Sequence, residues 1–243
     1  MDIATFAVEA EVEATHWWFV GRRRLFAAEL EKAGLKRTDR VLDIGTGTGA
    51  NLRLLRALGF TAVAGLDASE QAIGYCASKG LGVVQKGDIC ALPFADRYFD
   101  FVLATDVIEH VDDDSAAARE IARVLAHGGR ALITVPAFPC LWGLQDRQAF
   151  HKRRYRMKPL LALLRGAQLS PERYYHFNYL LFVPIYLARR IIDLLRIDLK
   201  SEGQVNNRLL NRLLSAVFSL DTGTAPALKL PFGVSILVVA RKD

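Results

Sequence analysis

The sequence predicts a doubly wound α/β fold, in which helices cover both faces of a largely parallel sheet. Short apolar segments alternate with helical segments between residues 40 and 135, which is the order of repeated βαβ units. The segment 99–105 is mainly apolar, as expected of a strand buried on both faces. The 243 residues are 51% apolar and 24% charged, so they can form one large core. We therefore expect a single domain over residues 1–243.

The predicted elements follow one another without a repeat or a low-complexity segment. Strands are expected at residues 40–44, 62–66, 82–85, 99–105, 130–135, 173–177 and 233–240. Helices are expected at residues 15–33, 50–58, 69–79, 115–126, 159–166, 179–199 and 205–220. Thr15 is the expected N-cap of the first helix, and Gly34 is its expected end.

The formal net charge of +6 favours anionic partners, namely phosphates, acidic sugars, nucleic acid or a membrane surface. Cys76, Cys90 and Cys140 are far apart and lack the spacing of metal ligands. We therefore expect reduced thiols, a cytoplasmic protein and no metal site. Residues 1–13 contain acids and no apolar run, and we expect no secretory signal there.

A glycine-rich turn, Asp43-Ile44-Gly45-Thr46-Gly47-Thr48-Gly49, joins the first predicted strand to the next helix. Glycine lets the backbone turn tightly and approach a ligand, and a helix N-terminus favours negative charge. In an open parallel sheet, ligands bind at the carboxyl ends of the strands, where this turn lies. The turn also fits the loose dinucleotide fingerprint Gly45-x-Gly47-x-x-Ala50, so by itself it leaves a nicotinamide cofactor and S-adenosylmethionine open.

Three acids at strand ends favour S-adenosylmethionine. Asp43 precedes the glycines, where its carboxylate can meet the cationic amino-acid end of that cofactor and would repel a pyrophosphate. Asp67 can accept hydrogen bonds from both ribose hydroxyls, although nicotinamide enzymes place an acid there too. Asp88 can accept from the adenine amine while Ile89 contacts the ring. Each acid also has a structural alternative, as a turn or helix-capping residue.

Further motifs follow the same order of strands and turns. They are Gly65-Leu66-Asp67-Ala68-Ser69, Gly87-Asp88 with Pro93-Phe94, Phe99-Asp100-Phe101-Val102, Glu109-His110-Val111, and Val124-Leu125 followed by Gly128-Gly129. With the glycine turn, they resemble class I S-adenosylmethionine-dependent methyltransferases over about residues 38–137. The resemblance implies a Rossmann-like, mostly parallel sheet of seven strands whose last strand is antiparallel, which suits the predicted strand at the C-terminus.

The resemblance also implies which residues hold S-adenosylmethionine. The positions that match the family are Asp43, Gly45, Thr46 and Gly47 for the methionine moiety, Asp67 and Ala68 for the ribose, Asp88 and Ile89 for adenine, and Asp106 near the methionine end. Position 46 is threonine here, where many relatives have cysteine.

Methyl transfer from a sulfonium to oxygen or nitrogen needs orientation and a base. The candidate catalytic residues are His151, His110 and Tyr155. His110 follows the fourth strand, and its structural alternative is a histidine packed at a helix start. His151 and Tyr155 lie in the loop after the fifth strand, at the carboxyl edge of the sheet, where the alternative is a solvated basic loop.

Two segments are candidates for substrate binding. Arg153 and Arg154 could clamp a phosphate or carboxylate bidentately. Three adjacent aromatics near the N-terminus cannot share one helix face. We therefore predict a lid in which Trp18 and Arg22 bind the substrate. The alternative is a helix that packs on the sheet. The Trp-Trp-Phe-x-Gly-Arg-Arg opening resembles a subgroup of bacterial and archaeal methyltransferases that often accompany polysaccharide or lipid-linked glycan enzymes.

The long segment 179–230 is interpreted as a helical insertion that caps the sheet, because about 50 residues ending in a core strand seldom fold alone. Its apolar part, 177–199, contains Arg189, Arg190 and Arg196, and suits core packing, a homodimer interface or peripheral membrane contact. Pro184 and the arginine pair argue against a spanning helix. The expected parts are a lid at 1–37, a cofactor-binding core at 38–137, a substrate-side loop and strand at 138–178, the insertion at 179–230 and the last strand at 231–243.

We expect in-line O-methylation of a small-molecule, glycan or lipid-linked acceptor. One alternative is methylation of RNA or another nucleic acid, which suits the charge but for which we identify no separate binding module. A non-catalytic cofactor-binding partner subunit is a second alternative, and a nicotinamide dehydrogenase is a third.

Overall fold

A computed structural model describes residues 10–195 and 207–243. Within these residues, seven strands form one sheet in the order β3-β2-β1-β4-β5-β7-β6. Strands β1 to β5 run parallel, and β7 is antiparallel to both β5 and β6. The predicted α/β class, with a mostly parallel sheet and an antiparallel last strand, is confirmed.

Each predicted strand is present, with small changes in its bounds. The strands are β1 (Arg40–Ile44), β2 (Ala62–Asp67), β3 (Val84–Lys86), β4 (Phe99–Thr105), β5 (Leu125–Pro136), β6 (Leu169–Phe177) and β7 (Ser235–Lys242). The predicted start of β5 at residue 130 is too late, because Leu125 already pairs with Phe99 before an irregularity in the register. The preceding helix is correspondingly shorter than predicted.

The helices are α2 (Trp17–Lys32), α3 (Ala50–Ala57), α4 (Glu70–Ser78), α5 (Asp114–Val124), α6 (Leu144–Gln148), α7 (Met157–Gly166), α8 (Phe182–Leu195) and α9 (Arg208–Leu228), with 3-10 turns η1 (Ile108–His110) and η2 (Pro139–Leu141). The prediction of Thr15 as the N-cap of α2 is wrong, because His16 holds that position and accepts from the Trp18 N–H. The prediction that the last helix ends at residue 220 is also wrong. Buried Asp221 and Ala225 continue its packed face.

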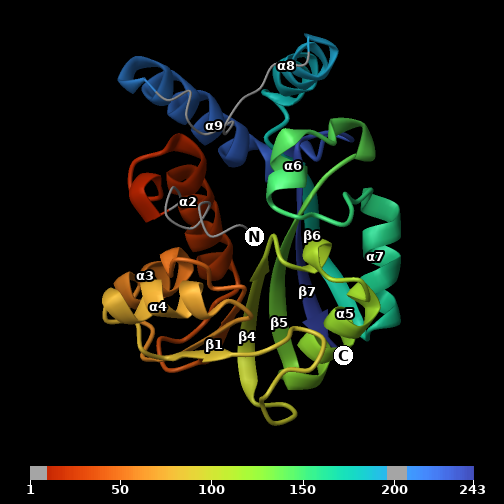
Figure 1. Ribbon diagram of the computed structural model, residues 1–243. Helices are drawn as coiled ribbons and strands as arrows, with labels where there is room; N and C mark the ends of the chain where they lie inside the picture. The colour runs from red at the N-terminus through yellow and green to blue at the C-terminus, as the bar shows by residue number, and fades with distance from the viewer. Residues whose placement is uncertain (1–9, 196–206) are drawn as a thin grey trace.

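Alternate residues of the central strands face two separate cores. On one side, Leu42 and Val102 pack with residues of α5 and α7. On the other, Val41 and Phe101 pack with residues of α2, α3 and α9. Figure 1 shows α2, α3 and α4 on one side of the sheet and α5 and α7 on the other. Because β1, β2 and β4 are parallel, the turns that follow them meet at one edge.

Helices α8 and α9 extend beyond the sheet at the end away from the C-terminus (Figure 1). Phe218 of α9 lies 5.3 Å from both Trp17 and Trp18 of α2, measured between ring centroids. Arg189 of α8 is buried and donates to the Leu141 carbonyl. No helix among residues 10–195 and 207–243 is long and apolar enough to cross a membrane. Predictions for residues 1–9, 196–199 (including Arg196) and 205–206 lie outside the described residues.

Candidate active site

The glycine turn between β1 and α3 folds back against the end of β2. The N–H groups of Gly45 and Thr46 donate to the Leu66 carbonyl, at 2.8 and 3.2 Å. Gly45 and Gly47 have φ values of 71° and 55°, a region in which a side chain is strained. A Cβ on Gly45 would lie 2.3 Å from Val107, whereas a Cβ on Gly47 would meet nothing within 4 Å. The turn is therefore packed on one side and open at Gly47.

Asp43 is a fully buried carboxylate with one unused oxygen. Its Oδ1 accepts from Asn51 Nδ2 at 3.0 Å, and the same amide donates to Thr105 Oγ1. Its Oδ2 has no hydrogen-bond partner. Burial, together with the nearby Asp67 charge, raises the pKa of Asp43 to about 7. A buried acceptor without a donor is costly, so this oxygen is suited to a cationic ligand group.

The Asp67 carboxylate is held by two backbone amides at the end of β2. Its Oδ2 accepts from Gly47 N at 2.8 Å, and its Oδ1 accepts from Ser69 N at 2.8 Å. Each oxygen keeps a second lone pair for another donor. The adjacent Ala68 is exposed. The carboxylate is therefore oriented before any ligand binds.

The residues predicted to meet adenine lie after β3. Asp88 is exposed, and its Oδ1 accepts from Cys90 N at 2.8 Å. Ile89 is buried in the core that contains Leu66. Ile89 therefore has a packing role in the fold.

The segment before α2 is bonded to the glycine turn. Glu13 is buried and accepts from the Thr48 hydroxyl, from Arg53 at 2.6 Å and from Lys79 at 2.8 Å. Sequence reasoning missed Glu13, because the two cations that neutralise it, Arg53 and Lys79, come from other elements.

Asp106 connects the turn after β4 to α2. Its Oδ2 lies 2.5 Å from Arg22 Nη2, and its Oδ1 accepts from Thr134 Oγ1 at 3.1 Å. The Arg22 guanidinium also lies over the Trp18 ring, 5.3 Å from its centroid. Trp18 in turn stacks on Phe177 at 6.2 Å. The predicted lid residues therefore lie at the same edge as Asp106, although Trp18 is packed on protein rather than free.

Glu109, His110 and His151 meet beside this edge. Each offers one ligand atom, and these atoms all lie within 4.8 Å of one another. Neither carboxylate oxygen of Glu109 has a partner, and burial together with the Asp106 charge raises its pKa well above the ordinary value. Burial and the neighbouring His151 lower the pKa of His110 to about 4. The structure thus brings the two predicted histidines together and adds the carboxylate of Glu109. Glu109 was not predicted as a site residue, although its position directly before His110 could have indicated it.

Asp146 organises the loop that carries His151. It accepts from Arg154 Nε and Nη2 at 2.8 and 2.9 Å and bonds His151 Nδ1 at 2.8 Å. Although burial opposes it, hydrogen bonds from His151 and Arg154 lower the pKa of Asp146 to about 2. The prediction of Arg154 as a substrate residue is wrong, because its side chain is 3% exposed and bonds Asp146 and the Ala137 carbonyl.

Two further predicted residues hold the loop to the turn after β4. Arg153 donates to the carbonyls of Val111 and Asp112 and lies 2.9 Å from Asp114. Tyr155 is buried and donates to Asp114 Oδ2 at 2.8 Å. Burial and Asp114 raise the pKa of Tyr155 far above its ordinary value. The prediction of Tyr155 as a base is therefore wrong.

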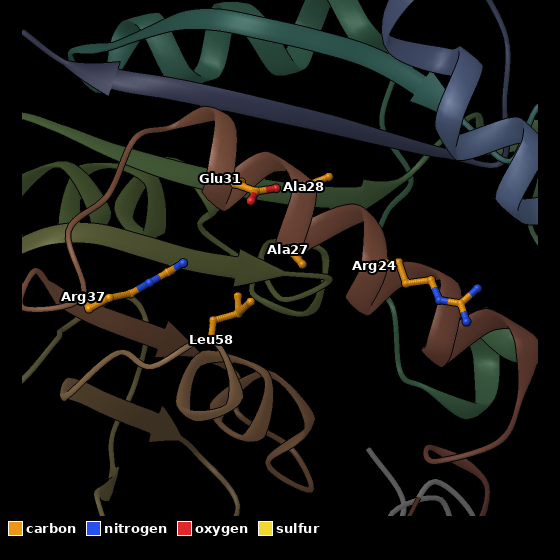
Figure 2. A pocket seen from close by; sticks show the side chains of 6 residues that line it. All are labelled: Arg24, Ala27, Ala28, Glu31, Arg37 and Leu58. Atoms are coloured by element: carbon orange, nitrogen blue, oxygen red, sulfur yellow. The ribbon is translucent and has the colours of Figure 1, made fainter.

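A cavity of about 270 Å³ lies elsewhere, between α2 and the end of α3. Figure 2 shows its lining residues, which are Arg24, Ala27, Ala28, Glu31, Arg37 and Leu58. Arg37 precedes β1, so the cavity lies at the opposite edge of the sheet from the glycine turn. It is not a candidate for the cofactor site.

Comparison with known proteins agrees with this geometry. A family model described as a methyltransferase domain matches residues 42–133. Over 177 residues, the chain is 31% identical to a demethylmenaquinone methyltransferase from Mycobacterium sp. (strain KMS), a match that covers 71% of this chain and 68% of that protein. The chain belongs to the class I S-adenosylmethionine-dependent methyltransferases.

One further relative matches a smaller share of the chain, and a solved structure shows the same fold. A ubiquinone/menaquinone biosynthesis C-methyltransferase from Bdellovibrio bacteriovorus is 29% identical over 146 residues, which are 55% of this chain and 62% of that protein. The chain thus spans about two thirds of the length of the curated relatives it matches. The crystal structure of a protein assigned as a sarcosine dimethylglycine methyltransferase from Galdieria sulphuraria has a TM-score of 0.62 at 20% identity, covering 93% of this chain and 86% of that one.

The residues present in this methyltransferase fit S-adenosylmethionine. The partnerless oxygen of Asp43 suits a cationic amino group, and the space at Gly47 lets the ligand approach the backbone. The family membership also argues against a nicotinamide dehydrogenase.

Proposed function

We propose that this methyltransferase transfers its methyl group to an oxygen atom of a lipid-linked acceptor, such as a quinone or a lipid-linked glycan. The observation that carries the proposal is the position of the Glu109, His110 and His151 cluster. The turn that bears Glu109 and His110 contacts the glycine turn, because Val107 packs against Gly45. Nitrogen and carboxylate groups beside the methyl donor are what an acceptor hydroxyl needs as it loses its proton.

We assign the cofactor contacts to the strand-end residues. Asp43 would receive the amino group, with Gly45, Thr46 and Gly47 forming the turn around the methionine moiety. Asp67 would accept from the ribose hydroxyls beside Ala68, because two amides already orient it. Asp88 and the edge of Ile89 would meet adenine, and Asp106 would lie near the methionine end. S-adenosylmethionine supplies an electrophilic methyl group on its sulfonium.

Two observations support a lipid-linked acceptor. The curated relatives are named for demethylmenaquinone and for ubiquinone/menaquinone biosynthesis. Helix α8 also exposes Val183, Leu187 and Ile191 on one face, four residues apart. The Trp-Trp-Phe-x-Gly-Arg-Arg opening of α2, which resembles that of glycan-associated methyltransferases, makes a lipid-linked glycan the second acceptor to test.

The test uses purified protein with S-adenosylmethionine carrying a ¹³C methyl group. Reduced demethylmenaquinone and a polyprenyl-linked sugar are offered separately, and the products are analysed by carbon NMR. We expect a methoxy carbon, formed about 100-fold more slowly by His151→Gln. His127→Gln is the control, because His127 is exposed on the surface. A ring-carbon methyl group, or label transferred only to RNA, would contradict the proposal.

A further inference from the structure

We propose that Glu109, His110 and His151 bind a divalent transition-metal ion. Their ligand atoms already lie within 4.8 Å of one another. Glu109 and His110 are in η1, directly after β4, and His151 is in the loop before α7. Lys152 N donates to the Glu109 carbonyl at 2.8 Å, which holds the two segments together.

The environment of Glu109 indicates a cation. Its side chain is 0% exposed, and neither of its oxygens has a hydrogen-bond partner. The nearby arginines form their ion pairs with other carboxylates, Arg22 with Asp106 and Arg154 with Asp146, and their charges offset the burial of Glu109 only in part. An isolated buried carboxylate is strongly unfavourable, and buried charges are normally paired or bound to metals. A bound cation would give one of these oxygens a partner and neutralise the carboxylate.

His151 is oriented as metal-binding histidines are. Its Nδ1 lies 2.8 Å from Asp146 Oδ1, and Asp146 is in turn held by Arg154 and by Gly143 N. The ionised Asp146 accepts a hydrogen bond from Nδ1–H, which leaves the lone pair of Nε2 free. A carboxylate behind a histidine in this way fixes the ring and increases its basicity toward a metal. His110 has a corresponding backbone partner in Ala149.

The ligand set indicates the class of metal. Two imidazole nitrogens and one carboxylate oxygen suit Zn²⁺, Mn²⁺, Co²⁺ or Fe²⁺ better than Mg²⁺ or Ca²⁺, which prefer oxygen ligands. Three protein ligands leave a coordination position open, as in catalytic metal sites. If the proposed O-methylation is correct, the acceptor oxygen takes that position. The ion then lowers the pKa of its hydroxyl so that the proton passes to water, and the three side chains act as ligands in place of a base. This inference departs from the prediction of no metal site, which rested on cysteine spacing alone.

The test is a titration of chelator-treated full-length protein with Co²⁺, followed by visible absorption, with metal content measured by mass spectrometry. We expect one Co²⁺ per chain and displacement by Zn²⁺. Glu109→Gln and His151→Gln should each weaken binding at least about tenfold, because loss of even an outer-shell partner of a metal ligand has an effect of that size. His127→Gln is the matched control, and circular dichroism checks that each variant is folded.

The outcomes separate this site from the proposed function. No Co²⁺ spectrum at millimolar metal, or unchanged affinity in both variants, would overturn the metal site. A folded Glu109→Gln protein that is more stable than wild type and binds no less metal would identify Glu109 as a neutral buried acid. If the protein binds the metal but methylates carbon, the metal site is supported and the proposed O-methylation is contradicted.

Discussion

At the scale of single residues, the site depends on carboxylates that the fold orients before a ligand arrives. Asp67 already uses one lone pair on each oxygen for a backbone amide. Asp43 keeps Oδ2 without any partner. Because the Asp67 carboxylate is already oriented, binding loses less conformational entropy. Because Asp43 Oδ2 is buried without a partner, a cationic ligand group that bonds it contributes more to the binding free energy.

Replacing Asp67 with alanine tests the proposed ribose contact. We expect Asp67→Ala to weaken S-adenosylhomocysteine binding by about 1–3 kcal/mol in isothermal calorimetry, because hydrogen bonds to a charged group would be lost. Glu172→Ala, at an exposed ion pair with Arg130, should bind normally. An unchanged dissociation constant for Asp67→Ala would refute the ribose role.

The pH dependence of stability tests the state of Asp43. Its folded-state pKa of about 7 lies above the ordinary value, so the unliganded fold prefers the protonated form. The stability that this preference contributes is complete below about pH 4 and is lost as pH rises to about 7. Between about pH 4 and pH 7, the melting temperature of wild type should therefore fall relative to that of Asp43→Asn. Above about pH 7, the difference between the two melting temperatures should stay constant. A pH-independent difference would show that Asp43 is ionised throughout.

At the scale of elements, α2 connects the site to the insertion. It supplies Arg22 to Asp106, while its Gly21 faces Phe218 of α9. The three adjacent aromatics could not share one face, and the structure gives Trp17 and Trp18 a second surface on Phe218. The sequence showed that a partner was needed, but α9 lies about 200 residues away, too far for any local pattern to identify it.

Filling the space at Gly21 should disrupt this junction. A Cβ there would lie 2.2 Å from Phe218 Cδ1, so we expect Gly21→Ala to lower the free energy of unfolding by about 1–3 kcal/mol in urea. Gly74→Ala in α4 is the matched control, since nothing lies within 4 Å of its Cβ. That control should instead gain about 0.5–1 kcal/mol from helix propensity. Equal effects in the two variants would mean that the junction is not close-packed.

At the scale of the whole molecule, the insertion places apolar helices beyond the edge where methyl transfer is proposed. Leu194 of α8 and Leu209 of α9 are 82% and 79% exposed. Arg190 and Arg212 are exposed on the same two helices. Exposed apolar side chains with nearby cations suit the surface of an anionic membrane.

Cosedimentation with vesicles tests this peripheral contact. We expect the protein to bind vesicles containing phosphatidylglycerol, and Leu187→Glu with Leu213→Glu to reduce partitioning at least about tenfold, since burying one leucine contributes about 1.5–3 kcal/mol. Val83→Glu, at an exposed apolar residue beside β3, is the control. If wild type and the double variant sediment equally, the exposed apolar side chains of α8 and α9 serve another purpose, such as the predicted homodimer.

The sequence by itself determined the fold class, the strand order along the chain and the acids around the glycine turn. These follow from local patterns: apolar periodicity, glycines between a predicted strand and a helix, and acids directly after strands. Tertiary structure decided what the loop residues contact. Arg154 and Tyr155 looked free in the sequence, yet Asp146 and Asp114 bind them. Glu109 and His110 are adjacent in the sequence, but His151 joined them only when the turn after β4 met the loop before α7. The interactions of a charged side chain depend on which distant groups the sheet brings near it, and one-dimensional spacing does not contain that information.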